Sequence, residues 1–121
     1  SSIQFLAMGH GWEAWKTMPH ERQRLIDLID TSSSNSVLFI SGDRHRGGLY
    51  QLTSSSGKNI VEMTSSSLNL SFTNDEEAGP LRVGPTFVQE NYGEILLNKL
   101  TNKLTVNLKD NQGQIIQSVD L

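Results

Sequence analysis

The pattern of apolar and polar positions begins with three elements in the order strand, helix, strand. Residues 2–8 alternate between apolar and polar positions, as in a half-buried strand. Residues 19–30 start at a proline and place apolar side chains three and four positions apart, which predicts an amphipathic helix. Residues 37–40 are continuously apolar, as in a buried strand. A strand–helix–strand unit favours parallel strands, so we expect 2–8 and 37–40 to lie parallel.

The remainder of the chain predicts antiparallel sheet. Residues 49–53 and 59–64 flank a Ser/Gly turn, which is typical of a hairpin. Three further strands are predicted at about 91–98, 104–109 and 114–120. Short polar turns join them, so we expect an antiparallel meander. Residues 71–85 lack a regular pattern and predict a long loop, a kind of segment that often carries function.

The composition indicates one structural unit over residues 1–121, because no linker divides the chain. There are 10 Lys and Arg against 13 Asp and Glu, a net charge of −3, so no nucleic-acid-binding surface is expected. The absence of Cys excludes disulfides, thiol nucleophiles and thiolate ligands. No apolar run approaches the roughly 20 residues of a membrane span. A predicted core strand at the first residues leads us to expect further chain before Ser1.

The segment Gly42-Asp43-Arg44-His45 follows the apolar run and is the main candidate site. If the backbone stays extended, the side chains of Asp43 and His45 point to the same side, because side-chain direction alternates along a strand. A carboxylate and an imidazole that converge at a strand end suit a divalent or trivalent metal. On spacing alone, a second interpretation stays open: Asp43 caps backbone amides in a turn, and His45 is polar surface.

Two arginines flank this pair. Arg44 and Arg46 are candidates for substrate binding, since a guanidinium matches a phosphate group bidentately. In an extended segment Arg44 faces away from Asp43 and His45, which favours a structural ion pair for it.

Other polar residues have two interpretations each. His10, between two glycines, is either a substrate-facing residue or a surface histidine. Asn69 and the serines before it either reach the edge of the site or hold a serine-rich turn. Trp12 is expected to be a packing anchor. The acidic run at residues 75–77 lacks the spacing of a Ca²⁺ loop and predicts a solvated face.

Five short motifs occur in a characteristic order: Ser1-Ser2-Ile3-Gln4; Trp15 with Pro19-His20-Glu21-Arg22 and Arg24-Leu25; Ser41-Gly42-Asp43-Arg44-His45; Thr64-Ser65-Ser66-Ser67-Leu68-Asn69; and Asn91-Tyr92-Gly93-Glu94-Ile95. Through these motifs, most of the chain resembles the C-terminal part of the PhoD-like (alkaline phosphatase D) branch of the calcineurin-like metallophosphoesterases. No single motif is decisive, but their order and spacing are specific.

The resemblance implies a mixed α/β fold, the C-terminal half of a four-layer α/β/β/α sandwich with one βαβ unit followed by antiparallel strands. It implies hydrolysis of a phosphomonoester or phosphodiester by two divalent or trivalent metal ions (Ca, Fe, Mn or Zn). Asp43 and His45 would be metal ligands in the catalytic centre, and Arg46, Arg44, His10 and Asn69 would be candidates for substrate contact. The family also suggests an extracytoplasmic location.

The chain departs from the family in lacking most of the metal ligands. It has no Gly-Asp pair except Gly42-Asp43 and no Asn-His pair. Because a metal centre needs four to six donors, we expect an N-terminal half of the same protein to supply the others. Residues 1–121 alone are then expected to be inactive and to self-associate through an open sheet edge. The alternative is a non-catalytic β-rich interaction module, in which the motif is plain turn chemistry.

Overall fold

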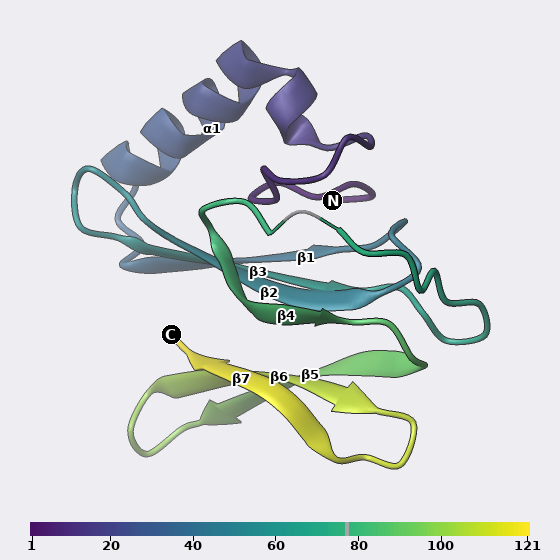
Figure 1. Cartoon of the computed structure of the whole chain (residues 1–121). Helices are drawn as coiled ribbons and strands as arrows, with labels where there is room; N and C mark the ends of the chain where they lie inside the picture. Colours follow the sequence, from purple (N-terminus) through teal and green to yellow (C-terminus); the bar gives the residue numbers. More distant parts are fainter. Residues whose placement is uncertain (77) are drawn as a thin grey trace.

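The computed structural model describes residues 1–76 and 78–121, which fold into two sheets and an α-helix (Figure 1). A short 3-10 helix at Trp15–Thr17 precedes the helix α1, Pro19–Thr31. The strands are β1 Ser36–Ser41, β2 Gly47–Thr53, β3 Asn59–Ser65, β4 Arg82–Phe87, β5 Asn91–Asn98, β6 Lys103–Asp110 and β7 Ile115–Asp120. Among the described residues, no helix is long and apolar enough to cross a membrane.

The first sheet has the strand order β1-β3-β2-β4 and the second the order β5-β6-β7. Strands β1 and β3 are parallel, with Val37 opposite Ile60, and the other pairs are antiparallel. Figure 1 shows α1 and the N-terminal segment over one face of the first sheet and the second sheet against the other face. The described residues therefore form three layers. The mixed α/β class is confirmed, whereas the four-layer sandwich is not.

Several sequence predictions are confirmed: the helix, the β2–β3 hairpin, and the β5–β6–β7 meander all lie within a few residues of the expected bounds. The predicted loop at 71–85 is wrong at its end, because β4 begins at Arg82 and pairs with β2 across a bulge. Gly84 and Pro85 lie inside this edge strand, and Gly84 has a φ of 69°. Glycine and proline are typical of loops, so they led to the loop prediction. Both residues are also tolerated in edge strands and at bulges, which is where they occur here.

The predicted strand at 2–8 is wrong. Gln4 forms only an isolated bridge with Ala14, and the parallel partner of β1 is β3. The N–H groups of Phe5 and Leu6 instead donate to the two carboxylate oxygens of Glu62, at 2.8 and 2.6 Å. Because a side chain on β3 satisfies these buried donors, the segment crosses the sheet face without joining a strand ladder.

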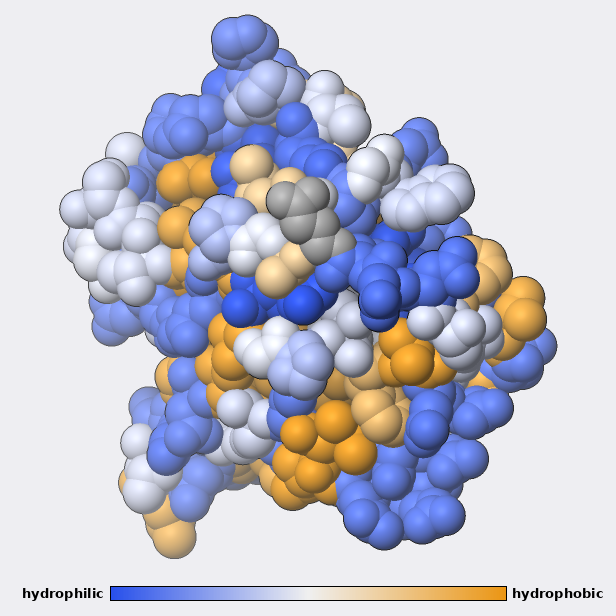
Figure 2. Space-filling model, in the orientation of Figure 1, coloured by the Kyte–Doolittle hydropathy of each residue, from blue (hydrophilic) through white to orange (hydrophobic). Residues whose placement is uncertain are grey.

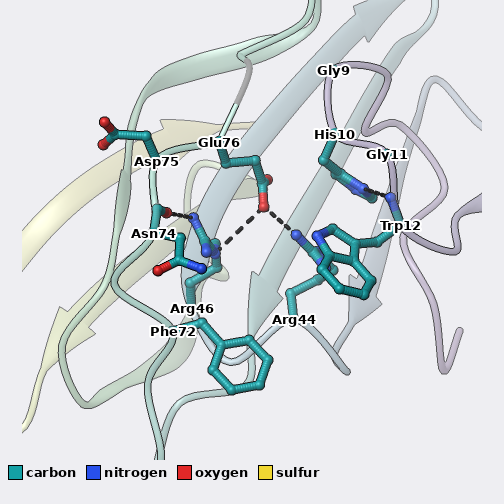
Figure 3. Close-up of a pocket in the computed structure, with 10 residues that line it drawn as sticks. All are labelled: Gly9, His10, Gly11, Trp12, Arg44, Arg46, Phe72, Asn74, Asp75 and Glu76. Carbon is teal, nitrogen blue, oxygen red and sulfur yellow. Dashed lines mark hydrogen bonds and ion pairs between the residues drawn. The ribbon is translucent and has the colours of Figure 1, made fainter.

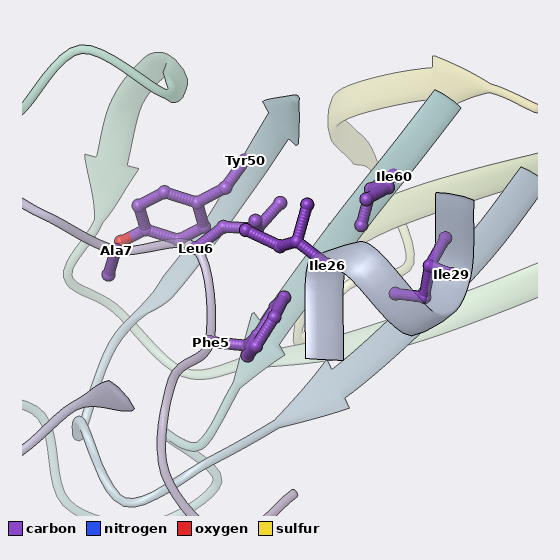
Figure 4. Packing of buried hydrophobic residues seen from close by; sticks show 7 residues of the cluster. All are labelled: Phe5, Leu6, Ala7, Ile26, Ile29, Tyr50 and Ile60. Atoms are coloured by element: carbon purple, nitrogen blue, oxygen red, sulfur yellow. The ribbon is translucent and has the colours of Figure 1, made fainter. Parts of the chain in front are cut away.

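Two apolar clusters lie on the two faces of the first sheet. On the helix side, Phe5, Leu6 and Ala7 pack with residues of α1, β2 and β3 (Figure 4). Between the sheets, Leu49 and Met63 pack with Val106. Alternation along the strands assigns neighbouring residues to opposite clusters. The central strands are consequently buried on both faces, and polar side chains on the helix-side face lie inside the protein.

Candidate functional site

The turn after β1 is not extended, contrary to the prediction. Asp43 has a φ of 60° and His45 a φ of 50°, both in the left-handed region. Neighbouring segments hold this conformation through hydrogen bonds. The N–H of Arg44 donates to Ser66 Oγ at 2.9 Å, and the N–H of Phe72 donates to the carbonyl of His45 at 2.9 Å. Such tertiary contacts offset the cost of placing two non-glycine residues in this region.

His45 is fixed in both orientation and tautomer. Its Nδ1 lies 3.0 Å from the carbonyl oxygen of Leu70, and its ring stacks on Phe72 with centroids 4.2 Å apart and planes at 12°. A carbonyl oxygen only accepts, so Nδ1 carries a proton, and in the neutral tautomer that this contact selects the lone pair is on Nε2. Metal-binding histidines in proteins are commonly held in this way.

Asp43 and His45 line one cavity of about 200 Å³, which we call the turn pocket, together with Trp12, Glu13, Arg44 and Phe72. Asp43 is exposed, and no described residue forms a hydrogen bond or ion pair with its carboxylate. The alternative interpretation, in which Asp43 caps backbone amides, is therefore not seen in the described residues. Among those residues, no three His, Cys, Asp or Glu side chains form a group that could hold a metal ion.

Arg44 and Arg46 converge on Glu76. One carboxylate oxygen, Oε2, forms an ion pair with Nη2 of Arg44 and lies 3.4 Å from Nε of Arg46. Nη1 of Arg46 also donates to the carbonyl of Asn74 at 3.0 Å. The ion pair expected for Arg44 is therefore present, and its partner comes from the loop before β4.

The acidic run is only in part a solvated face. Asp75 is exposed as predicted, but the side chain of Glu76 is only 5% exposed. Residue 77 lies outside the described residues. The prediction was wrong for Glu76 because two buried guanidinium groups need a counter-charge close by, and the sequence does not show which acid supplies it.

The two arginines and Glu76 line a second cavity of about 230 Å³, which we call the arginine pocket (Figure 3). Residues 9–12, Phe72 and residues 74–76 form much of its wall. The turn pocket and the arginine pocket share Trp12, Arg44 and Phe72, so they are neighbours. Trp12 is 67% exposed at their border and is not the packing anchor that was predicted.

His10 is buried, and both its ring nitrogens are used within the protein. Nε2 lies 2.8 Å from Gln4 Oε1, and Nδ1 accepts from the N–H of Trp12 at 3.1 Å. The proton is thus on Nε2 and the ring is neutral. Burial, and then the nearby charge of Arg44, lower the pKa of His10 to about 4. His10 borders the arginine pocket with no free ring nitrogen, so the surface-histidine interpretation is wrong.

Asn69 is exposed and lines neither the turn pocket nor the arginine pocket. The serines before it act on the backbone: Ser66 holds the N–H of Arg44, and Ser67 Oγ donates to the carbonyl of Leu70 at 3.3 Å. The observed contacts therefore agree with the interpretation in which the serines hold a turn through bonds to the backbone.

A buried polar network behind the site was missed from the sequence. Gln4 Nε2 donates to Tyr50 Oη at 3.0 Å and to Thr64 Oγ1 at 2.8 Å, and Thr64 also bonds Ser41 Oγ at 2.9 Å. Burial raises the pKa of Tyr50 to about 12. These residues come from the N-terminal segment and from three different strands, so no local sequence pattern indicated the network. The network connects the ends of β1 and β3 to His10.

Acidification is expected to destabilise the protein through His10. Its pKa of about 4 lies below the unfolded value of 6.5, so its contribution is complete above pH 6.5 and is lost as the pH falls towards 4. The full loss is at most about 3 kcal/mol. Urea unfolding of the wild type and His10→Gln between pH 7 and 4 tests this. The stability difference should shrink on acidification, and a constant difference would contradict the prediction.

In comparisons with known proteins, no family model matches the chain, and no curated protein or solved structure is significantly similar to it. The resemblance to PhoD-like metallophosphoesterases therefore stays a prediction.

Proposed function

We propose that this chain forms part of the catalytic centre of a metal-dependent phosphoesterase and is the C-terminal portion of that enzyme. The observation that carries the proposal is His45. Its Nδ1 is hydrogen-bonded to the carbonyl of Leu70, which leaves Nε2 as the ring nitrogen that could bind a metal, and His45 lines the same pocket as Asp43. Two arginines lie in the neighbouring pocket. Metal ions and guanidinium groups both stabilise the charge on a phosphoryl group during its transfer.

The residues present fit a metal ion in part. His45 offers Nε2 and Asp43 offers a carboxylate without a partner among the described residues, a donor set that suits Mn, Fe or Zn, with Ca better matched by carboxylate alone. Metal ions at such a centre polarise the phosphoryl group and activate a nucleophile. Since a centre needs four or more donors, the proposal requires further ligands from elsewhere in the same protein.

The chain's own residues would act on a phosphate ester as follows. His45 is held in one orientation, because the carbonyl of Leu70 and the ring of Phe72 fix its imidazole. The guanidinium groups of Arg44 and Arg46 neutralise the phosphoryl oxygens, and their burial strengthens that interaction by keeping water away.

The partner proposed for this chain is the N-terminal half of the same protein. Strands β1 and β5 are edge strands, and both border an apolar groove of about 370 Å³. Ile40, which is 52% exposed, and Tyr92 are among its lining residues. Ser1 N donates to the carbonyl of Ile40 at 3.0 Å, so the first residue lies beside β1. Strands of the other half would then extend both sheets and cover the groove.

Residues 1–121 alone are expected to self-associate, because the edge of β1 and this groove stay open. Figure 2 also shows hydrophobic surface over the three-stranded sheet, where Ile95, Leu97 and Ile115 are exposed. Edge pairing and apolar burial at about 25 cal/mol per Å² favour association. Sedimentation at micromolar concentration should show dimers or larger species, fewer of them in an Ile40→Lys variant. A monomer at all concentrations would contradict the proposed open edge.

Metal-dependent hydrolysis tests the function. The complete protein, loaded with Mn²⁺, Fe³⁺, Zn²⁺ or Ca²⁺, should hydrolyse a nitrophenyl phosphomonoester or phosphodiester and lose activity in EDTA. Residues 1–121 alone should bind metal weakly and show no turnover. A complete protein that hydrolyses neither ester under any metal would refute the proposal and favour the interaction module, for which the groove beside β1 and β5 is the supporting observation.

A further inference from the structure

The two guanidinium groups of the arginine pocket share a single carboxylate oxygen. The side chains of Arg44 and Arg46 are only 7% and 6% exposed, and both contact Oε2 of Glu76 (Figure 3). Within the described residues, Nε of each arginine is buried and has no hydrogen-bond partner. Nε of Arg46 lies 3.4 Å from Oε2 without hydrogen-bond geometry. Most of the N–H donors of this pair are therefore poorly used by Glu76.

Among the described residues, Glu76 is the only acid that forms an ion pair with Arg44 or Arg46, and it does not balance the charge of both. Two guanidinium groups and one carboxylate carry one net positive charge, and His10 adds none because it is neutral. A buried charge without full compensation is costly. A tetrahedral dianion would balance both arginines, and its several oxygens would accept from the Nε–H and Nη–H groups together.

The position of Glu76 allows its carboxylate to leave. Arg44 and Arg46 lie between β1 and β2, and Glu76 lies in the loop before β4, so none of the three belongs to a strand. The backbone of the loop is held separately: Arg82 Nη1 donates to the carbonyl of Glu76 at 3.2 Å. The neighbouring Asp75 carboxylate points away from the arginines (Figure 3). A rotation of the Glu76 side chain would vacate the position between them without disturbing a sheet.

We infer that Arg44 and Arg46 form a binding site for a phosphate-like dianion and that the Glu76 carboxylate occupies this site in the free protein as an internal competitor. The inference rests on the proposed function only for the choice of phosphate as the ligand. Phosphate can bind only to molecules in which Glu76 has left the arginines. The smaller the fraction of such molecules, the weaker the apparent affinity of the free protein for phosphate.

Phosphate titration without metal tests this inference. The wild type, Glu76→Gln and Asp75→Asn are titrated with inorganic phosphate in EDTA at constant ionic strength, by calorimetry and by the NMR signals of the arginine Nε–H groups. Glu76→Gln should bind phosphate about 10- to 100-fold more tightly than the wild type. Asp75→Asn removes the same charge from the adjacent, exposed position and should change the affinity less than about 3-fold. Adding Arg44→Gln to Glu76→Gln should abolish the gain.

The outcomes below either support the internal competition by Glu76 or overturn it. Equal gains in Glu76→Gln and Asp75→Asn would indicate long-range electrostatics and overturn it, as would arginine signals that phosphate does not shift. If Glu76→Gln or the shorter Glu76→Asp folds only with phosphate present, the inference is supported. If both stay unfolded with phosphate, Glu76 is a structural partner and the inference fails. Phosphate binding without metal-dependent hydrolysis would refute only the proposed function, and hydrolysis without the gain in Glu76→Gln would refute only this inference.

Discussion

Replacing His45 with alanine is expected to lower kcat/KM for phosphate-ester hydrolysis by the complete, metal-loaded protein about 10²- to 10³-fold. Loss of a metal ligand removes charge stabilisation worth several kcal/mol, and each 1.36 kcal/mol corresponds to about a factor of ten. The metal content of the purified variant should fall as well. Asp43→Asn is expected to have the same direction of effect, because its carboxylate borders the same pocket.

Two variants separate ligation from packing. His45→Phe keeps a ring stacked on Phe72 but removes both nitrogens, so its activity should be as low as that of His45→Ala. His20→Ala removes an exposed histidine from the first turn of α1 and should leave kcat/KM unchanged. Normal activity and metal content in His45→Phe would show that the imidazole does not bind metal.

Replacing Glu62 with alanine is expected to lower the free energy of unfolding by about 3–5 kcal/mol. The side chain is fully buried, and its two oxygens accept the N–H groups of Phe5 and Leu6. The alanine variant leaves both donors buried without an acceptor and creates a cavity. Urea unfolding measures the loss, and hydrogen exchange should show faster exchange of the Phe5 and Leu6 amides. Glu62→Gln keeps one acceptor and should lose less.

Glu90, an exposed carboxylate, provides the control: Glu90→Ala should change stability by less than about 0.5 kcal/mol.

The pH dependence of the stability of Glu62 variants gives a second readout. Burial raises the pKa of Glu62 above its ordinary value of 4.5, so its contribution is complete below pH 4.5 and declines as the pH rises through the folded pKa. The wild type should therefore gain stability relative to Glu62→Gln on acidification. If Glu62→Ala and the wild type had the same free energy of unfolding, the N-terminal segment would be held by its apolar contacts alone.

Local patterns in the sequence determined the regular elements. The apolar spacing in α1 and the turn residues between β2 and β3 and between β5, β6 and β7 depend on neighbours within a few residues. Those elements were predicted nearly to their ends. The pairing of Asp43 with His45 in one pocket was also expected, but for the wrong reason: a left-handed turn, not an extended strand, brings them together.

Tertiary structure alone decided the rest, because the decisive partners are distant in sequence. Whether residues 2–8 form a strand depends on Glu62, which accepts their N–H groups from the middle of β3. Whether Glu76 is solvated depends on Arg44 and Arg46, about thirty residues earlier. A polar residue in an alternating pattern normally faces water, and only the folded chain supplies the donors and counter-charges that make its burial favourable. The sequence therefore located the polar residues around the turn after β1, and the fold determined which of their groups are already paired within the protein.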